Sequence, residues 1–250
     1  MTVLLIDDPA PGVRRLTLNR PERLNALSRE LVERLEGAFA QVEDDLAVRV
    51  VVLRGAGSSF CAGADFDEHF RENGYDVGRT NLWERIESSR APVVAAVQGW
   101  AVTGGFLLAY CCDVVVTADS ARFRDTHAVL GLVPTGGESQ RMPRRLGPFI
   151  ARDLMLTSRV MGAEEALRIG FASRVVPGDQ LDSAALEVAT TIADNAARSV
   201  EAIKQLINVG SQADLGVGLR LEALRNQFGQ ANNTDDPERR ARLDRIRGSR

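Results

Sequence analysis

The sequence predicts an α/β protein whose C-terminal part is a region of helices only. Short runs of β-branched residues alternate with amphipathic segments as far as residue 176, which is typical of helices packed around a mainly parallel sheet. From Gln180 onward every segment has the pattern of a helix, and this tail is longer than a cap on the core requires. We therefore expect an α/β core over residues 1–197 and a helical region over residues 198–250.

The individual elements follow from local patterns. Buried strands are predicted where β-branched runs are bounded by turn-forming residues, and helices where apolar residues recur at helical spacing. The predicted strands are Val3–Asp7, Val13–Asn19, Arg49–Leu53, Val93–Val97, Asp113–Val116, Arg122–Phe123 and Ala172–Val176. The predicted helices are a segment capped by Ser28 and the segments Asp65–Asn73, Thr80–Ser89, Phe106–Cys112, Glu138–Leu146, Phe149–Leu156 and Ala163–Ile169. Between the second and third of these helices, Gly74–Arg79 is expected to be a linker.

The composition is that of a soluble globular protein, with 44% hydrophobic residues, 26% charged residues and a net charge of −3 over 250 residues. This charge is too small to indicate nucleic-acid binding. Three cysteines without metal-ligand spacing and only two histidines predict reduced thiols and no metal site. The N-terminus lacks the basic start of a signal peptide, and no apolar run approaches the roughly 18 residues that span a bilayer. We expect a cytoplasmic protein with no membrane partner.

The stretch Pro92–Val116 contains the clearest candidate for a site. A buried strand precedes Gly104 and Gly105, and an apolar helix follows them. A helix that begins here presents unpaired backbone N–H groups and the positive end of its dipole. Thr103 suits the N-cap position, and glycine allows a ligand to approach the backbone closely. Alternatively, a buried helix needs these small residues only for packing.

Five motifs follow one another along the chain: NRPERLNAL, SSFCAGADF, AVQGWAVTGGFLLAYCCDVVV, DSARFRDTHAVLGLVPTGGESQRMPRRLG and GAEEALRIGFASRVVP. Together they resemble the crotonase superfamily, the enoyl-CoA hydratase/isomerase family, over nearly the whole chain. The resemblance implies a crotonase-type spiral of repeated ββα units with a C-terminal helical trimerisation region, and therefore a homotrimer or homohexamer. It also implies an acyl-CoA thioester substrate, with coenzyme A as part of that substrate and no separate cofactor.

The resemblance also assigns roles to individual residues. In the family, two backbone N–H groups hold the thioester oxygen and stabilise the enolate, and the matching residues here are Ala64 and Gly104. The residues that match positions wrapped around the CoA moiety are Arg23, Leu24, Ala62, Asp65 and Phe66. The stretch Phe66–Trp83 is expected to contribute to the wall of the acyl pocket.

The sequence departs from the family pattern where hydratases carry two catalytic glutamates. Leu107 matches the first and His127 the second, while Thr135 stands where many family isomerases and hydrolases have an acid. Because leucine cannot transfer a proton, the two-glutamate mechanism is not available in its usual form, and Leu107 and Thr135 are expected only to line the substrate site. His127, with an ordinary pKa near ~6.5, can act as acid or base, or it can be a loop residue without that role.

Glu138 is a further candidate for catalysis, although an acid is also favoured in the first turn of any helix. Asp125 is expected to tie down the loop rather than to do chemistry. We therefore expect an enzyme that stabilises the enolate of an acyl-CoA and uses His127 for proton transfer in isomerisation, hydrolysis or atypical hydration. Two other functions stay open: a non-catalytic acyl-CoA binding protein, and a carbon–carbon bond hydrolase that acts on a β-diketone without CoA.

Overall fold

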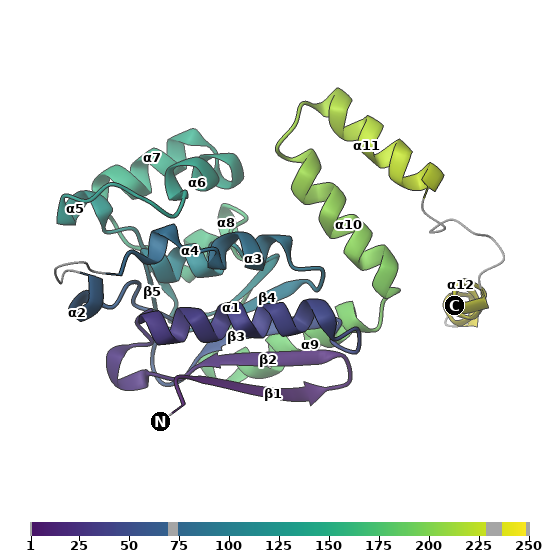
Figure 1. The fold of residues 1–250 in the computed structure, drawn as a ribbon, viewed down its shortest axis with the longest axis horizontal. Coiled ribbons are helices and arrows are strands. Elements are labelled where there is room, and N and C mark those ends of the chain that lie inside the picture. The colour runs from purple at the N-terminus through teal and green to yellow at the C-terminus, as the bar shows by residue number, and fades with distance from the viewer. Residues whose placement is uncertain (1, 70–74, 229–236, 249–250) are drawn as a thin grey trace. The chain divides into compact units, whose positions relative to one another are not determined.

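The computed structural model describes residues 2–69, 75–228 and 237–248 (Figure 1). The chain forms two compact units that divide between Ala197 and Arg198. The first unit combines strands and helices, as the sequence predicts. The helices described in the second unit are α10 (Ala197–Gly210), α11 (Leu215–Phe228) and α12 (Pro237–Gly248).

The segment over residues 65–79 is described in part. The predicted helix over Asp65–Asn73 begins as α2 (Phe66–His69), and the predicted linker contains the 3₁₀ turn η2 (Val77–Arg79). Residues 70–74, on which both predictions also fall, lie outside the described residues.

The main sheet of the first unit has six strands in the order β1-β2-β3-β4-β6-β9. The hairpin of β1 and β2 is antiparallel, and every later pairing is parallel. Alternate residues of β3 enter two separate cores, with Val51 and Leu53 on one face and Val50 and Val52 on the other, so both faces are buried as in other parallel sheets. The strands are β1 (Leu4–Ala10), β2 (Val13–Leu18), β3 (Val50–Gly55), β4 (Val93–Val97), β6 (Val114–Ala118) and β9 (Arg174–Val176).

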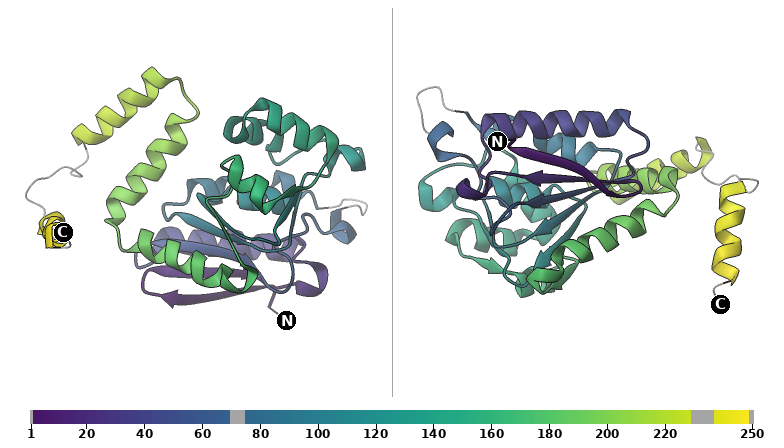
Figure 2. Two further views of the ribbon diagram at one scale, coloured as in Figure 1. Left: turned by 180° about the vertical axis from the view of Figure 1, so that it is seen from behind. Right: turned by 90° about the horizontal axis from the view of Figure 1, so that it is seen from below.

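Helices cover both faces of this sheet (Figure 2). On one face lies α1 (Arg29–Asp44), whose first turn is capped by the Ser28 hydroxyl as predicted, together with α3 (Leu82–Ser88). On the other face, α9 (Leu181–Ala193) packs against β3, β4 and β6. Among the described residues, no helix has the length and apolarity needed to cross a membrane.

A second sheet of three short strands carries the loops that matter for the site. Its order is β5-β7-β8, with β5 (Trp100–Val102), β7 (Arg122–Arg124) and β8 (Met161–Gly162). Cys61 joins it through an isolated bridge to Ala101. The buried helix α4 (Gly104–Tyr110) starts directly after β5, and all its residues are buried. The outer helices of this region are α5 (His127–Leu130), α6 (Glu138–Leu146), α7 (Pro148–Thr157) and α8 (Ala163–Arg168).

Candidate active site

Two backbone amides meet at the start of α4. The loop at Ala64 pairs with Leu27 like a strand, since the Leu27 N–H donates to Gly63 O at 2.7 Å and the Asp65 N–H donates to Leu27 O at 3.2 Å. This pairing uses the amides on either side of Ala64 and turns the Ala64 N–H away from Leu27. A Cβ atom built on Gly104 would lie 3.7 Å from Ala64 N. In the described part of the chain, neither the Ala64 N–H nor the Gly104 N–H has a hydrogen-bond partner.

The neighbouring residues hold this arrangement tightly. A Cβ atom on Gly105 would overlap the carbonyl group of Cys61, with its carbon at 2.7 Å, so glycine is required there. Thr103 has φ 49° and ψ −105°, a strained backbone conformation of the kind that costs about 1–3 kcal/mol and clusters at functional sites. Thr103 occupies the N-cap position as predicted, but its hydroxyl makes no capping bond. The hydroxyl instead contacts Thr126 Oγ1 at 2.5 Å and accepts from the Thr126 N–H at 3.1 Å, which ties α4 to the loop before α5.

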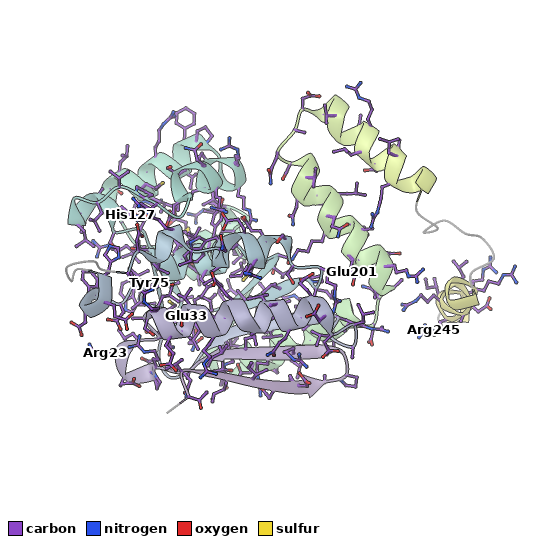
Figure 3. All side chains as sticks on the ribbon, viewed as in Figure 1. Arg23, Glu33, Tyr75, His127, Glu201 and Arg245 are labelled. Carbon is purple, nitrogen blue, oxygen red and sulfur yellow. The ribbon has the colours of Figure 1, made fainter. Side chains whose placement is uncertain are left out.

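His127 begins α5, below the layer of α6 and α7 (Figure 3). Its Nδ1 lies 3.1 and 3.0 Å from the two carboxylate oxygens of Asp125, and its backbone N–H donates to Asp125 Oδ1 at 3.0 Å. Asp125 is 1% exposed. Burial acts to lower the pKa of His127, but the hydrogen bond and charge of Asp125, with smaller contributions from Glu138 and Asp76, raise it above its ordinary value overall. Asp125 thus ties the loop, as predicted, and also orients the imidazole.

Glu138 is the first residue of α6 and is only 5% exposed. A Cβ atom on Gly136 would lie 2.6 Å from Leu107 Cδ2 and 3.3 Å from each carboxylate oxygen of Glu138, so these two side chains meet at Gly136. Glu138 Oε2 is buried, and no residue in the described ranges makes a hydrogen bond to it. Burial raises the pKa of Glu138, and the charge of Asp125 raises it further, against the opposing effects of nearby backbone N–H groups and His127.

Two cavities adjoin these groups, and Asp125 lines both of them. The smaller measures about 10 Å³, close to the volume that one water molecule needs, and lies among Thr103, Leu107, Asp125, Glu138 and Arg141. The larger measures about 400 Å³ and is lined by His127 together with apolar residues of α5, α6 and α7. A site that joins a titratable pair, a buried carboxyl and an apolar cavity is suited to proton transfer on a small organic group.

The residues predicted to surround CoA lie near one another but differ in exposure. Arg23, Leu24 and Phe66 are exposed, and the Ala62 N–H donates to Leu24 O at 2.9 Å. Asp65 is buried, and its carboxylate accepts hydrogen bonds from Arg20 at 2.8 Å and from the Asp67 N–H at 3.1 Å.

Thr135 is exposed and donates to Asp76 Oδ1 at 3.0 Å, while Leu107 is 2% exposed and lines the smaller cavity. No sequence motif predicted the role of Arg141. Its guanidinium group donates to Gly136 O and to both Glu87 oxygens, and so fixes the loop in front of α6. No group of three or more His, Cys, Asp or Glu side chains suited to a metal ion occurs among the described residues.

Comparison with known proteins identifies the family. The family model described as enoyl-CoA hydratase/isomerase matches residues 9–239. A Mycobacterium bovis protein described as a probable enoyl-CoA hydratase is 37% identical over 238 residues, which cover 94% of this chain and 91% of the relative. The short-chain-enoyl-CoA hydratase of Clostridium acetobutylicum is 37% identical over 228 residues, covering 88% of this chain and 86% of that protein.

Solved structures agree with the fold. The enoyl-CoA hydratase of Bacillus anthracis superposes with a TM-score of 0.90 at 33% identity, covering 100% of this chain and 97% of that one. A monofunctional enoyl-CoA isomerase of M. smegmatis superposes with a TM-score of 0.75 at 35% identity, covering 85% of this chain and 95% of that one. The predicted crotonase-type α/β spiral is thereby confirmed. This chain belongs to the enoyl-CoA hydratase/isomerase family.

Proposed function

We propose that this protein binds an acyl-CoA thioester, holds the thioester oxygen with the N–H groups of Ala64 and Gly104, and transfers a proton with His127. The observation that carries the proposal is the pair of unpartnered amides beside each other at the start of α4. Preorganised N–H donors of this kind stabilise an oxyanion as it develops, and loss of one typically costs about 10²–10³ in rate. The positive end of the α4 dipole adds to the same effect.

The Asp125–His127 contact supports the role of the histidine. Asp125 accepts from Nδ1, which places the proton on that nitrogen in neutral His127 and leaves Nε2 as the basic atom. His127 also lines the larger cavity, where a bound acyl group would lie. An imidazole held in this way can remove a proton from water or carbon and return it in the same cycle.

Enoyl-CoA thioesters are the substrate class that we propose, with hydration or isomerisation as the reaction. Support comes from the relatives described as hydratases and from the M. smegmatis isomerase. Arg23 and Leu24, both exposed, are proposed to contact the CoA moiety. By the same family resemblance we propose assembly as a homotrimer or homohexamer in the cytoplasm, with coenzyme A entering only as part of the substrate.

The test is turnover of crotonyl-CoA and of a 3-enoyl-CoA, followed by the change in enoyl absorbance. We expect His127→Ala to lower kcat by on the order of 10²–10⁴ while thioester binding, measured by calorimetry, is kept. Glu164→Ala is the control, because Glu164 is exposed in the first turn of α8 and lines neither cavity. Binding without turnover of either substrate would indicate a non-catalytic binding protein, and turnover of free β-diketones without CoA affinity would indicate the carbon–carbon hydrolase.

A further inference from the structure

The carboxyl of Glu138 is buried, and one of its oxygens has no hydrogen-bond partner among the described residues. It begins α6, where an acid is favoured by the helix dipole, but that preference needs no burial. Glu164 shows the contrast, since it stands in the first turn of α8 and is exposed. Burying a carboxylate with an unpaired oxygen costs several kcal/mol in general, so a feature of this kind is kept where it serves a purpose.

The surroundings of Glu138 connect it to the proposed reaction centre. Its carboxylate meets the Leu107 side chain at Gly136, one helical turn along α4 from the Gly104 amide. The water-sized cavity beside the Glu138 carboxyl is lined by Thr103, which directly precedes Gly104 in the chain, and by Asp125, which is hydrogen-bonded to His127. The buried carboxyl therefore shares a small cavity with Thr103, which adjoins the amide pair, and with Asp125, which adjoins the imidazole.

We propose that Glu138 is the second proton-transfer residue of this site and supplies, from the start of α6, the carboxyl group that Leu107 does not provide on α4. The proposal rests on the proposed function, because it needs a thioester held at Ala64 and Gly104. Glu138 is given this role because of where its carboxyl group lies in the structure, and not because its sequence position matches a catalytic glutamate of the family.

The chemistry in the hydration direction balances with two residues. Nε2 of His127 takes a proton from water as the water oxygen bonds to the β-carbon, and the electrons of the double bond move to the thioester oxygen, held by Ala64 and Gly104. The protonated carboxyl of Glu138 then gives its proton to the α-carbon, while the enolate electrons form the new C–H bond and restore the carbonyl. Return of one proton from His127 to Glu138 through solvent completes the cycle.

The charged and titratable groups around Glu138 favour this assignment. Asp125 lies near it in the loop after β7 and His127 at the start of α5, Tyr110 lines the same cavity from α4, and Arg141 lies one turn further along α6. The Arg141 guanidinium is held by the carboxylate of Glu87 and so does not form an ion pair with Glu138. Burial raises the pKa of Glu138 above its ordinary value, which favours the protonated state that donation requires.

The test compares Glu138→Gln, which keeps the shape of the side chain, with Glu164→Gln, which removes an acid from the equivalent turn of α8. We expect Glu138→Gln to lower hydration of crotonyl-CoA and deuterium incorporation at the α-carbon by at least about 10²-fold, with thioester affinity kept and no decrease in the unfolding midpoint. Glu164→Gln should retain the wild-type rate.

The pH profile separates proton transfer from a structural role. Wild-type kcat should be bell-shaped, falling at low pH as His127 is protonated and at high pH as Glu138 loses its proton, and Glu138→Gln should lose one limb. Glu138→Asp should keep both limbs at a reduced rate, and it serves as the test if the glutamine variant fails to fold. Full activity of Glu138→Gln, or a slow variant with both limbs, would overturn the proposal; in either case a large His127→Ala effect would leave the proposed function standing.

Discussion

Replacing Gly105 by alanine tests how α4 is positioned against the loop that carries Ala64. The new Cβ atom would overlap Cys61 O and would lie 2.7 Å from the carbonyl carbon and 2.9 Å from Cβ of the same residue. Cys61 cannot yield easily, because its N–H donates to Trp100 O at 3.0 Å and its carbonyl accepts from the Val102 N–H at 2.9 Å. Carbon atoms pack best at about 3.5–4.0 Å, so the two segments must separate by about 1 Å.

This displacement sets the expected size of both effects. Overpacking of a rigid core destabilises a protein by about 1–3 kcal/mol, whereas the better helix propensity of alanine stabilises it by less than about 1 kcal/mol. Gly105→Ala should therefore lower the free energy of unfolding by about 2 kcal/mol. The same movement separates the Ala64 and Gly104 amides. A misplacement of about 1 Å in a positioned group can cost about 10²-fold in rate, which is the loss expected in kcat/KM for crotonyl-CoA.

Gly37→Ala is the matched control, because Gly37 lies in α1 and an added Cβ atom meets nothing within 4 Å. That variant should gain stability by about 0.5–1 kcal/mol and keep full activity. Urea unfolding and steady-state kinetics measure both quantities. If Gly105→Ala were as stable and as active as wild type, the contact with Cys61 would not position the amide pair, and the reasoning would be refuted.

Three further predictions concern charged groups. Asp125→Asn should lower the pKa of His127 by removing the bond and charge that raise it, and NMR titration of the ring protons should place the wild-type value above 6.5 and the variant below the wild type. Glu138→Gln should unfold at a higher urea concentration than wild type at pH 8, and the difference between the two urea midpoints should narrow toward pH 4. The reason is that the pKa of Glu138 is raised in the folded state, so wild-type stability is lost as pH rises through that pKa. A difference between the midpoints that stays constant with pH would contradict this. Arg141→Ala should cost about 2 kcal/mol in urea unfolding, because it leaves the half-buried Glu87 carboxylate without its main partner, and a loss below about 0.5 kcal/mol would contradict that role.

The sequence predicted the elements whose stability comes from their own pattern. The helix expected over Glu138–Leu146 has those bounds in the structure, and the strand Val93–Val97 likewise. It did not predict β5 or β8, which have three and two residues, nor the short helix α5. Elements this short have no periodicity to detect and depend on tertiary partners, such as the pairing of β5 with β7.

The sequence likewise predicted some parts of the candidate site and not others. Glycines at the start of an apolar helix indicated an anion-binding helix end, and the family resemblance supplied the second amide, at Ala64. The structure brings those two amides together. The Thr103–Thr126 contact and the Arg141 anchor join residues far apart in the sequence, and Ser, Thr and Arg side chains give no local signal of a partner 23 or 54 residues away.

No local sequence pattern predicts that Glu138 is buried, because its burial depends on how α6 is oriented relative to α4. An acid in a first helical turn predicts only a favourable dipole interaction. Its orientation is fixed by Gly136, which leaves room for the Leu107 methyl group and the carboxylate on the same side, and by Arg141, which holds the Gly136 carbonyl. A leucine at position 107 and a buried acid at position 138 are therefore one feature: the apolar side chain forms the wall that desolvates the carboxyl. A glutamate at position 107 would place two carboxylates against each other in that space, so the two positions constrain each other.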